Sequence, residues 1–201
     1  TIDRSRPFGL SPSRAQWTLV VAGIGCCVAM AMPQVHLVAY CMQLGLSPLQ
    51  GTSMLSLMLG LGVISRLLFG WISDHIGGLK TLILSSGLQG LALSLFLPFD
   101  GVVSLFIIAG LFGLFQGGIV PAYAIVIREY FPITNMGNRI GTVIFGTLAG
   151  MAFGGWISGK LFDLTGTYAA AFLNGMAWNL LNLTICIWLY LRTRRDIPHA
   201  A

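Results

Sequence analysis

The sequence predicts an all-α membrane protein with six transmembrane helices, and three observations support this fold class. Hydrophobic residues make up 56% of the chain and charged residues only 8%, whereas a soluble domain carries about 25% charged residues. Six apolar runs are each long enough to cross a bilayer, which takes about 20 residues. The basic residues also gather on one side of a six-helix arrangement, as the positive-inside rule requires.

The six expected helices are bounded by proline, glycine or charged residues and span residues 17–44, 49–73, 79–98, 103–130, 139–162 and 168–191. Gly60 and Gly62 interrupt the second run only weakly, and its length favours a single helix. Residues 1–16 are expected to form a polar linker segment, 17–191 the transmembrane domain and 192–201 a tail.

Positive charge predicts the orientation of these helices. Nine basic residues share one side if six helices cross the membrane: Arg4, Arg6, Arg14, Lys80, Arg128, Arg139, Arg192, Arg194 and Arg195. The opposite side has Lys160. We therefore expect a multi-pass protein of the cell membrane with both termini in the cytoplasm. No apolar signal-peptide core precedes Trp17, and the start at Thr1 fits a chain whose upstream part is absent.

An internal echo predicts two inverted three-helix repeats. The sequence Gly-Trp-Ile-Ser occurs at 70–73 in the second expected helix and again at 155–158 in the fifth. Pro33 and Tyr40 of the first helix have counterparts in Pro121 and Tyr130 of the fourth. Inverted repeats of this kind build many secondary transporters.

Arg66 is the first candidate functional residue, because it lies inside an otherwise uncharged membrane run. A guanidinium at the bilayer centre costs roughly 2.5–3.5 kcal/mol on insertion scales. Arg66 lies eight residues before Asp74, or about 12 Å into the membrane at the rise of an α-helix. Its planar fork suits a carboxylate, so we expect an anion site. A structural arginine, paired with an acid on an absent helix, is the alternative.

Four further polar residues are candidates for the same cavity. His36 and Tyr40 are four residues apart on the first expected helix, and Gln116 and Tyr123 are seven apart on the fourth, so each pair is expected to share a face. Packing through hydrogen bonds between helices is the alternative for each. Gly146, Gly150 and Gly154 form a small-residue stripe that predicts close helix contact.

Other classes of function lack sequence support. The chain has no nucleophile–base pair, no metal-ligand cluster and no phosphate-binding glycine loop, so we expect neither an enzyme nor a cofactor. The four cysteines lie in apolar runs and are expected to be buried. The basic residues follow the membrane topology, so we expect a lipid bilayer rather than nucleic acid as the partner.

The segment GWISDHIGGLK at 70–80 resembles the cytoplasmic loop signature of the major facilitator superfamily. Gly70, Asp74 and Gly77 match the signature, His75 replaces its usual basic residue, and Lys80 comes later than its last position. The resemblance implies that these residues form a conformational gating loop between the second and third helices of a six-helix half.

A second resemblance is to the monocarboxylate and oxalate/formate transporter branch. It includes PQVHLVAY at 33–40, Ser65-Arg66 with Gly70, and Gly117-Gly118 through Arg128-Glu129-Tyr130. The resemblance implies that the chain is the C-terminal half of a twelve-helix carrier and that Arg66 contacts a substrate carboxylate. Lys160 lies near a helix end, unlike the mid-membrane lysine of oxalate carriers, so a single carboxylate is favoured.

These observations together predict secondary transport of a small organic anion by alternating access, with a missing N-terminal half completing the cavity. Proton symport, through His36 or through an acid of that half, is left open. One alternative is an exporter of amphipathic or cationic compounds in which Arg66 is structural. An alternative of another class is a membrane scaffold without transport.

Overall fold

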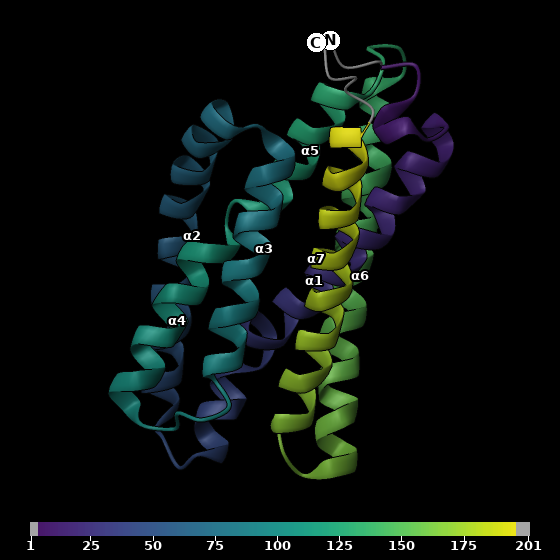
Figure 1. Ribbon diagram of the computed structural model, residues 1–201. Helices are drawn as coiled ribbons and strands as arrows, with labels where there is room; N and C mark the ends of the chain where they lie inside the picture. Colours follow the sequence, from purple (N-terminus) through teal and green to yellow (C-terminus); the bar gives the residue numbers. More distant parts are fainter. Residues whose placement is uncertain (1–3, 196–201) are drawn as a thin grey trace.

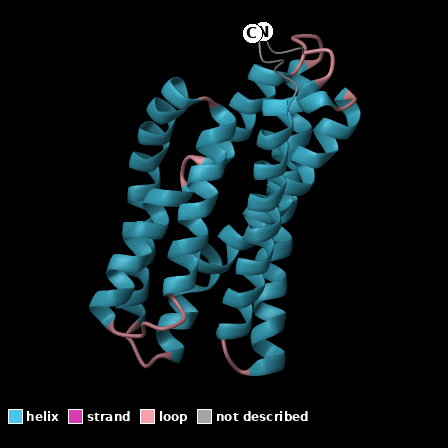
Figure 2. Cartoon of the chain, in the orientation of Figure 1, coloured by secondary structure: helices cyan, strands magenta, loops and turns pink. Residues whose placement is uncertain are grey.

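The computed structural model describes residues 4–195, and within that range the chain is helical and contains no strand (Figures 1 and 2). A short 3-10 helix, η1 (Pro7–Gly9), comes before seven α-helices. These are α1 (Pro12–Gln43), α2 (Pro48–Ile76), α3 (Gly78–Leu95), α4 (Val102–Gln116), α5 (Ile119–Tyr130), α6 (Met136–Thr165) and α7 (Ala169–Arg195).

The expected membrane spans are present in this bundle. Within residues 4–195, five helices are long and apolar enough to cross a membrane when α4 and α5 are taken as one. The sixth, α3, has 18 residues, or about 27 Å of helix. It is not one of those five, and its buried face carries Ser85, Ser86 and Gln89. The protein is a multi-pass membrane protein, as its sequence predicts.

The helices continue past the apolar runs that predicted them. α1 begins at Pro12, inside the segment expected to be a linker, and α7 runs through Arg195 into the expected tail. Helix formation does not stop where hydrophobicity does, since Pro12 suits a first helical position. The end of α7 is also fixed to the start of the chain, because Arg192 Nε donates a hydrogen bond to the carbonyl of Phe8 (3.1 Å).

The fourth expected helix is broken in the middle, which the sequence analysis did not foresee. α4 ends at Gln116 and α5 begins at Ile119, with Gly117 and Gly118 between them. Pro121 contributes to the break because it has no N–H to give to the carbonyl of Gly117. α4 and α5 still follow one another through the bundle, but residues on either side of the break no longer share a helix face as they would in one continuous helix.

Helix packing follows the two inverted repeats. α1 packs mainly on α6 and α7, and its repeat counterpart α4–α5 packs mainly on α2 and α3. Both echo segments also behave alike: Trp71 and Trp156 are 61% and 59% exposed, while Ser73 and Ser158 are buried. The matched environments support the division into α1–α3 and α4–α7.

Two hydrophobic clusters form the core, one toward each end of the bundle. The first gathers around Leu19, Tyr123 and Phe131, at the end where η1 and the α2–α3 turn lie (Figure 1). The second gathers around Tyr40, Phe96 and Phe172, at the opposite end. α1 and α4–α5 cross the bundle obliquely and contribute to both clusters.

Candidate functional site

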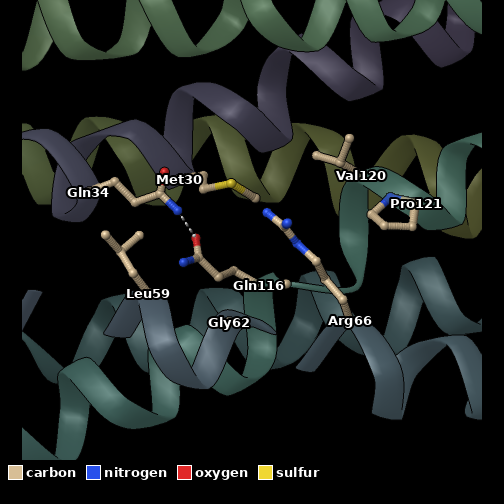
Figure 3. Close-up of a pocket in the computed structure, with 9 residues that line it drawn as sticks. Met30, Gln34, Leu59, Gly62, Arg66, Gln116, Val120 and Pro121 are labelled. Atoms are coloured by element: carbon tan, nitrogen blue, oxygen red, sulfur yellow. Dashed lines mark hydrogen bonds between the residues drawn. The ribbon is translucent and has the colours of Figure 1, made fainter. Parts of the chain in front are cut away.

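One cavity of about 350 Å³ opens between α1, α2 and the break in α4–α5. The residues that line it are Met30, Gln34, Leu59, Gly62, Arg66, Gln116, Gly117, Val120 and Pro121 (Figure 3). Its volume lies at the lower end of the range of about 300–1,000 Å³ for small-molecule pockets. The cavity therefore combines apolar walls with one cation and two amide side chains.

Arg66 extends from α2 into this cavity (Figure 3). Its side chain is exposed and has no hydrogen-bond, ion-pair or ring partner among residues 4–195. Arg66 lies ten residues before Ile76, where α2 ends, which places it about 15 Å from that end. An unpaired guanidinium at such a depth needs water, an anion or an acid from outside this part of the chain.

Gln34 and Gln116 face each other across the same cavity. Gln34 Nε2 donates a hydrogen bond to Gln116 Oε1 (3.0 Å), joining α1 to the end of α4. Gln116 is only 3% exposed. Gln116 was among the predicted site residues, whereas Gln34 was missed. Gln34 could have been found as a polar residue inside an apolar helix, directly after Pro33.

Close packing of α2 on the α4–α5 break determines where these side chains lie. A Cβ atom at Gly117 would overlap the carbonyl oxygen of Gly62, and one at Gly118 would overlap Phe69. The backbones therefore approach as only glycine allows. Ser65 Oγ also donates a hydrogen bond to the carbonyl of Leu114 (2.6 Å). This crossing brings Arg66 and Gln116, each next to a residue of the contact, to one cavity.

The structure does not bring His36 or Tyr40 to this cavity. His36 Nε2 donates a hydrogen bond to the carbonyl of Gly155 on α6 (2.8 Å), and Tyr40 OH donates one to the carbonyl of Phe96 (2.9 Å). Both rings pack near Tyr168, so they do share a face, as expected. That face points toward Gly155 of α6, Phe96 at the end of α3 and Tyr168 before α7, where carbonyls and a ring satisfy it.

Tyr123 also lies away from the cavity, in the core. Its hydroxyl donates a hydrogen bond to Asn182 Oδ1 (2.6 Å), and Asn182 Nδ2 donates one to Ser86 Oγ (2.8 Å). The seven-residue spacing from Gln116 does not give a shared face, because the break at Gly117 and Gly118 interrupts the helix. We call Tyr123, Asn182 and Ser86 the core network.

The predicted gating residues surround the turn between α2 and α3. Gly77 makes the turn with φ +85°, which favours glycine. Asp74 and Lys80 are exposed, and Asp74 has no partner among residues 4–195. Gly70 lies about two helical turns before Gly77 on α2, with open space beside it.

The acid that holds this turn is Glu129, to which the sequence analysis gave no role. Both carboxylate oxygens of Glu129 accept a hydrogen bond from the backbone N–H of Gly78 (2.9 and 3.1 Å). Gly78 is the first residue of α3, and a carboxylate suits a helix N-terminus. The sequence signal for Glu129 is that it directly follows Arg128 at the end of an apolar run.

The fold matches a known class of membrane protein. The crystal structure of a mutant of the peptide transporter POT, in complex with alafosfalin, superposes on 92% of this chain with a TM-score of 0.79, at 17% sequence identity. This chain covers 39% of that structure. The similarity shows the fold.

The sequence comparisons agree with the fold. Residues 18–201 match the family model of the Major Facilitator Superfamily. Monocarboxylate transporter 13 of Rattus norvegicus is 31% identical over 160 residues, which are 79% of this chain and 37% of that protein. Probable anion transporter 5 of Arabidopsis thaliana is 31% identical over 140 residues, 66% of this chain and 31% of that protein.

The chain belongs to the major facilitator superfamily, as its loop signature implied, and its relatives lie in the monocarboxylate branch. It spans between about 30% and 40% of the length of these relatives. That share fits one six-helix half of a twelve-helix carrier.

Proposed function

We propose that this chain is the C-terminal half of a carrier that moves small organic anions across the cell membrane, with both termini in the cytoplasm. The observation that carries the proposal is the guanidinium of Arg66, which has no partner among residues 4–195, in a small cavity between α1, α2 and the α4–α5 break. An arginine binds a carboxylate through two parallel hydrogen bonds. The names of the relatives, monocarboxylate transporter and anion transporter, point to the same chemistry.

The proposed mechanism is alternating access around Arg66. The substrate carboxylate pairs with the guanidinium while Gln116 contacts the rest of the molecule, and the N-terminal half supplies the opposite wall. The two halves then rock around this site. The α2–α3 turn, with Gly70, Asp74, Gly77 and Lys80, would stabilise one of the two states through contacts with the other half. His36, Tyr40 and Tyr123 would hold the helices that frame the site.

The test is uptake of labelled lactate, pyruvate, formate and oxalate into proteoliposomes that contain the complete carrier. Wild type is compared with Arg66→Gln and Arg66→Lys. We expect Arg66→Gln to lower uptake at least about 100-fold, because a charge-assisted bidentate contact is lost. Arg66→Lys keeps the charge without the fork and should retain part of the uptake.

Lys160→Gln is the matched control, since it removes a positive charge from the end of another membrane helix. Unchanged uptake in Arg66→Gln would show that the arginine is structural. Absence of uptake of any acid by the folded wild-type carrier would instead favour an exporter of amphipathic compounds.

A further inference from the structure

The bond between Gln34 and Gln116 leaves part of each amide unused. A glutamine side chain has one carbonyl acceptor and one NH₂ donor, and the single bond of 3.0 Å uses the NH₂ of Gln34 and the carbonyl of Gln116. The carbonyl of Gln34 and the NH₂ of Gln116 have no other partner among residues 4–195. Neither atom is among the fully buried side-chain atoms that lack a partner, so each keeps some exposed surface.

This conclusion does not depend on which atom of each amide is nitrogen. If oxygen and nitrogen were exchanged in both side chains, the bond would run in the other direction. One NH₂ group and one carbonyl would again be left over. Either way, a molecule in the cavity meets one donor and one acceptor at the glutamine pair, in addition to the guanidinium of Arg66.

The guanidinium and the glutamine pair line one cavity, in which a small molecule can meet both. Gly117, the neighbour of Gln116, would place a Cβ 2.7 Å from Cβ of Ser65, the neighbour of Arg66. Arg66 and Gln116 therefore project from one tight helix crossing, and Gln34 reaches the same cavity of about 350 Å³ from α1 (Figure 3). A carboxylate on Arg66 would hold the adjoining carbon atoms within that cavity.

A hydroxyl group is the substituent that matches the leftover donor and acceptor. It can give its proton to the amide carbonyl and accept a hydrogen bond from the NH₂ group. An oxo group only accepts, so it leaves the carbonyl unpaired, and a methylene group pairs with neither. A site that hydrogen-bonds a substrate hydroxyl discriminates strongly against analogues without it, because its own polar groups then lose their partners.

We propose that the Gln34–Gln116 pair reads a hydroxyl group on the transported anion, so that the carrier prefers a hydroxycarboxylate to the matched oxo- or unsubstituted carboxylate. This inference rests on the proposed function, since Arg66 must hold the carboxylate. It assigns a specificity role to Gln34 and defines that of Gln116. The pair acts on the choice between substrates, whereas Arg66 acts on all of them.

The test measures uptake of lactate, pyruvate and propionate, which share a three-carbon skeleton, by the complete carrier in proteoliposomes. Gln34→Leu and Gln116→Leu are compared with wild type. Gln43→Leu is the matched control, because Gln43 lies on the same helix and donates to the carbonyl of Gly166 (2.8 Å), away from the cavity. The ratio of lactate to pyruvate uptake does not depend on how much protein is folded.

Wild type and Gln43→Leu are expected to prefer lactate to the same degree. Each cavity variant should lower that ratio at least about fivefold, which is the loss of roughly one net hydrogen bond. Uptake of propionate, which has no hydroxyl, should fall less than uptake of lactate in both variants. An unchanged ratio in both cavity variants, with uptake still dependent on Arg66, would overturn this inference and leave the proposed function standing.

A wild-type carrier that takes up the three acids equally would also overturn the inference. If wild type takes up none of them, the proposed function fails and the inference fails with it. A role of the pair in packing alone would lower the uptake of all three acids by a common factor, which the ratio separates from a role in specificity.

Discussion

The core network and the cavity both place polar side chains inside an apolar bundle, but they differ in whether those side chains have partners. In the core, Asn182 uses both ends of its amide, accepting from Tyr123 OH and donating to Ser86 Oγ. In the cavity, Arg66 has no partner among residues 4–195, and the glutamine pair keeps a donor and an acceptor free.

From this difference we expect hydrogen-bond satisfaction to separate structural from ligand-binding polar residues better than polarity does. Moving a polar group out of water costs several kcal/mol of free energy unless the group is hydrogen-bonded. The hydrogen bonds of the core network are therefore expected to contribute to stability. A cavity group that the fold leaves unpaired is expected to contribute little to stability and to be available to bind a ligand. Substitutions in the two regions test this expectation, because they should affect stability and transport in opposite ways.

The largest effect on stability is expected from Asn182→Leu. This change leaves the buried hydroxyls of Tyr123 and Ser86 without their partner. Orphaned buried groups cost about 1–3 kcal/mol each in soluble proteins, but hydrogen bonds within membranes average only about 0.6 kcal/mol. We expect a loss of about 2 kcal/mol in unfolding free energy, measured by denaturation in detergent.

Asn174→Leu is the matched control on the same helix, because the Nδ2 atom of Asn174 is buried without a partner. It should leave stability unchanged or raise it. Equal losses in the two variants would mean that asparagine packing, and not the hydrogen bonds, stabilises α7.

An intermediate effect is expected at the α2–α3 turn, where one acid is paired and another is not. Glu129→Ala removes the carboxylate that accepts from the N–H of Gly78, and loss of such a cap costs about 1 kcal/mol. Asp74→Ala should cost nothing, since Asp74 has no partner in residues 4–195 and a negative charge is unfavourable at the end of α2.

Hydrogen exchange of the amide of Gly78 is the local measurement for this turn. It should speed up in Glu129→Ala and not in Asp74→Ala. If both variants exchange alike, the contact between Glu129 and Gly78 does not hold the turn. An effect of Asp74→Ala on transport alone would place Asp74 in contacts with the other half.

Most of the fold could be predicted from the sequence because a bilayer imposes length and hydrophobicity on each span. The six runs and the repeat echo depend only on composition and order. The break between Gln116 and Ile119 was missed because glycine pairs also occur within continuous membrane helices. Its cause includes the close contact of Gly117 and Gly118 with α2, which is a tertiary feature.

Less of the candidate site could be predicted. Arg66 was found because a charge inside a membrane run is costly, and Gln116 because of its polarity. Polarity alone could not show that Tyr123 faces Asn182, or that Tyr40 finds the carbonyl of Phe96. Gln34 was missed because its place in the candidate site depends on its contact with Gln116, which lies 82 residues away in the sequence.

The smallest effect on stability is expected from Arg66→Gln, although the same variant should lose the most transport. Its guanidinium makes no hydrogen bond, ion pair or ring contact among residues 4–195, and removing a charge from membrane depth relieves a cost. The midpoint of thermal unfolding in detergent should therefore stay the same or rise. A fall of several degrees would reveal a structural partner for Arg66, and the cavity would then belong with the core network as a part of the scaffold.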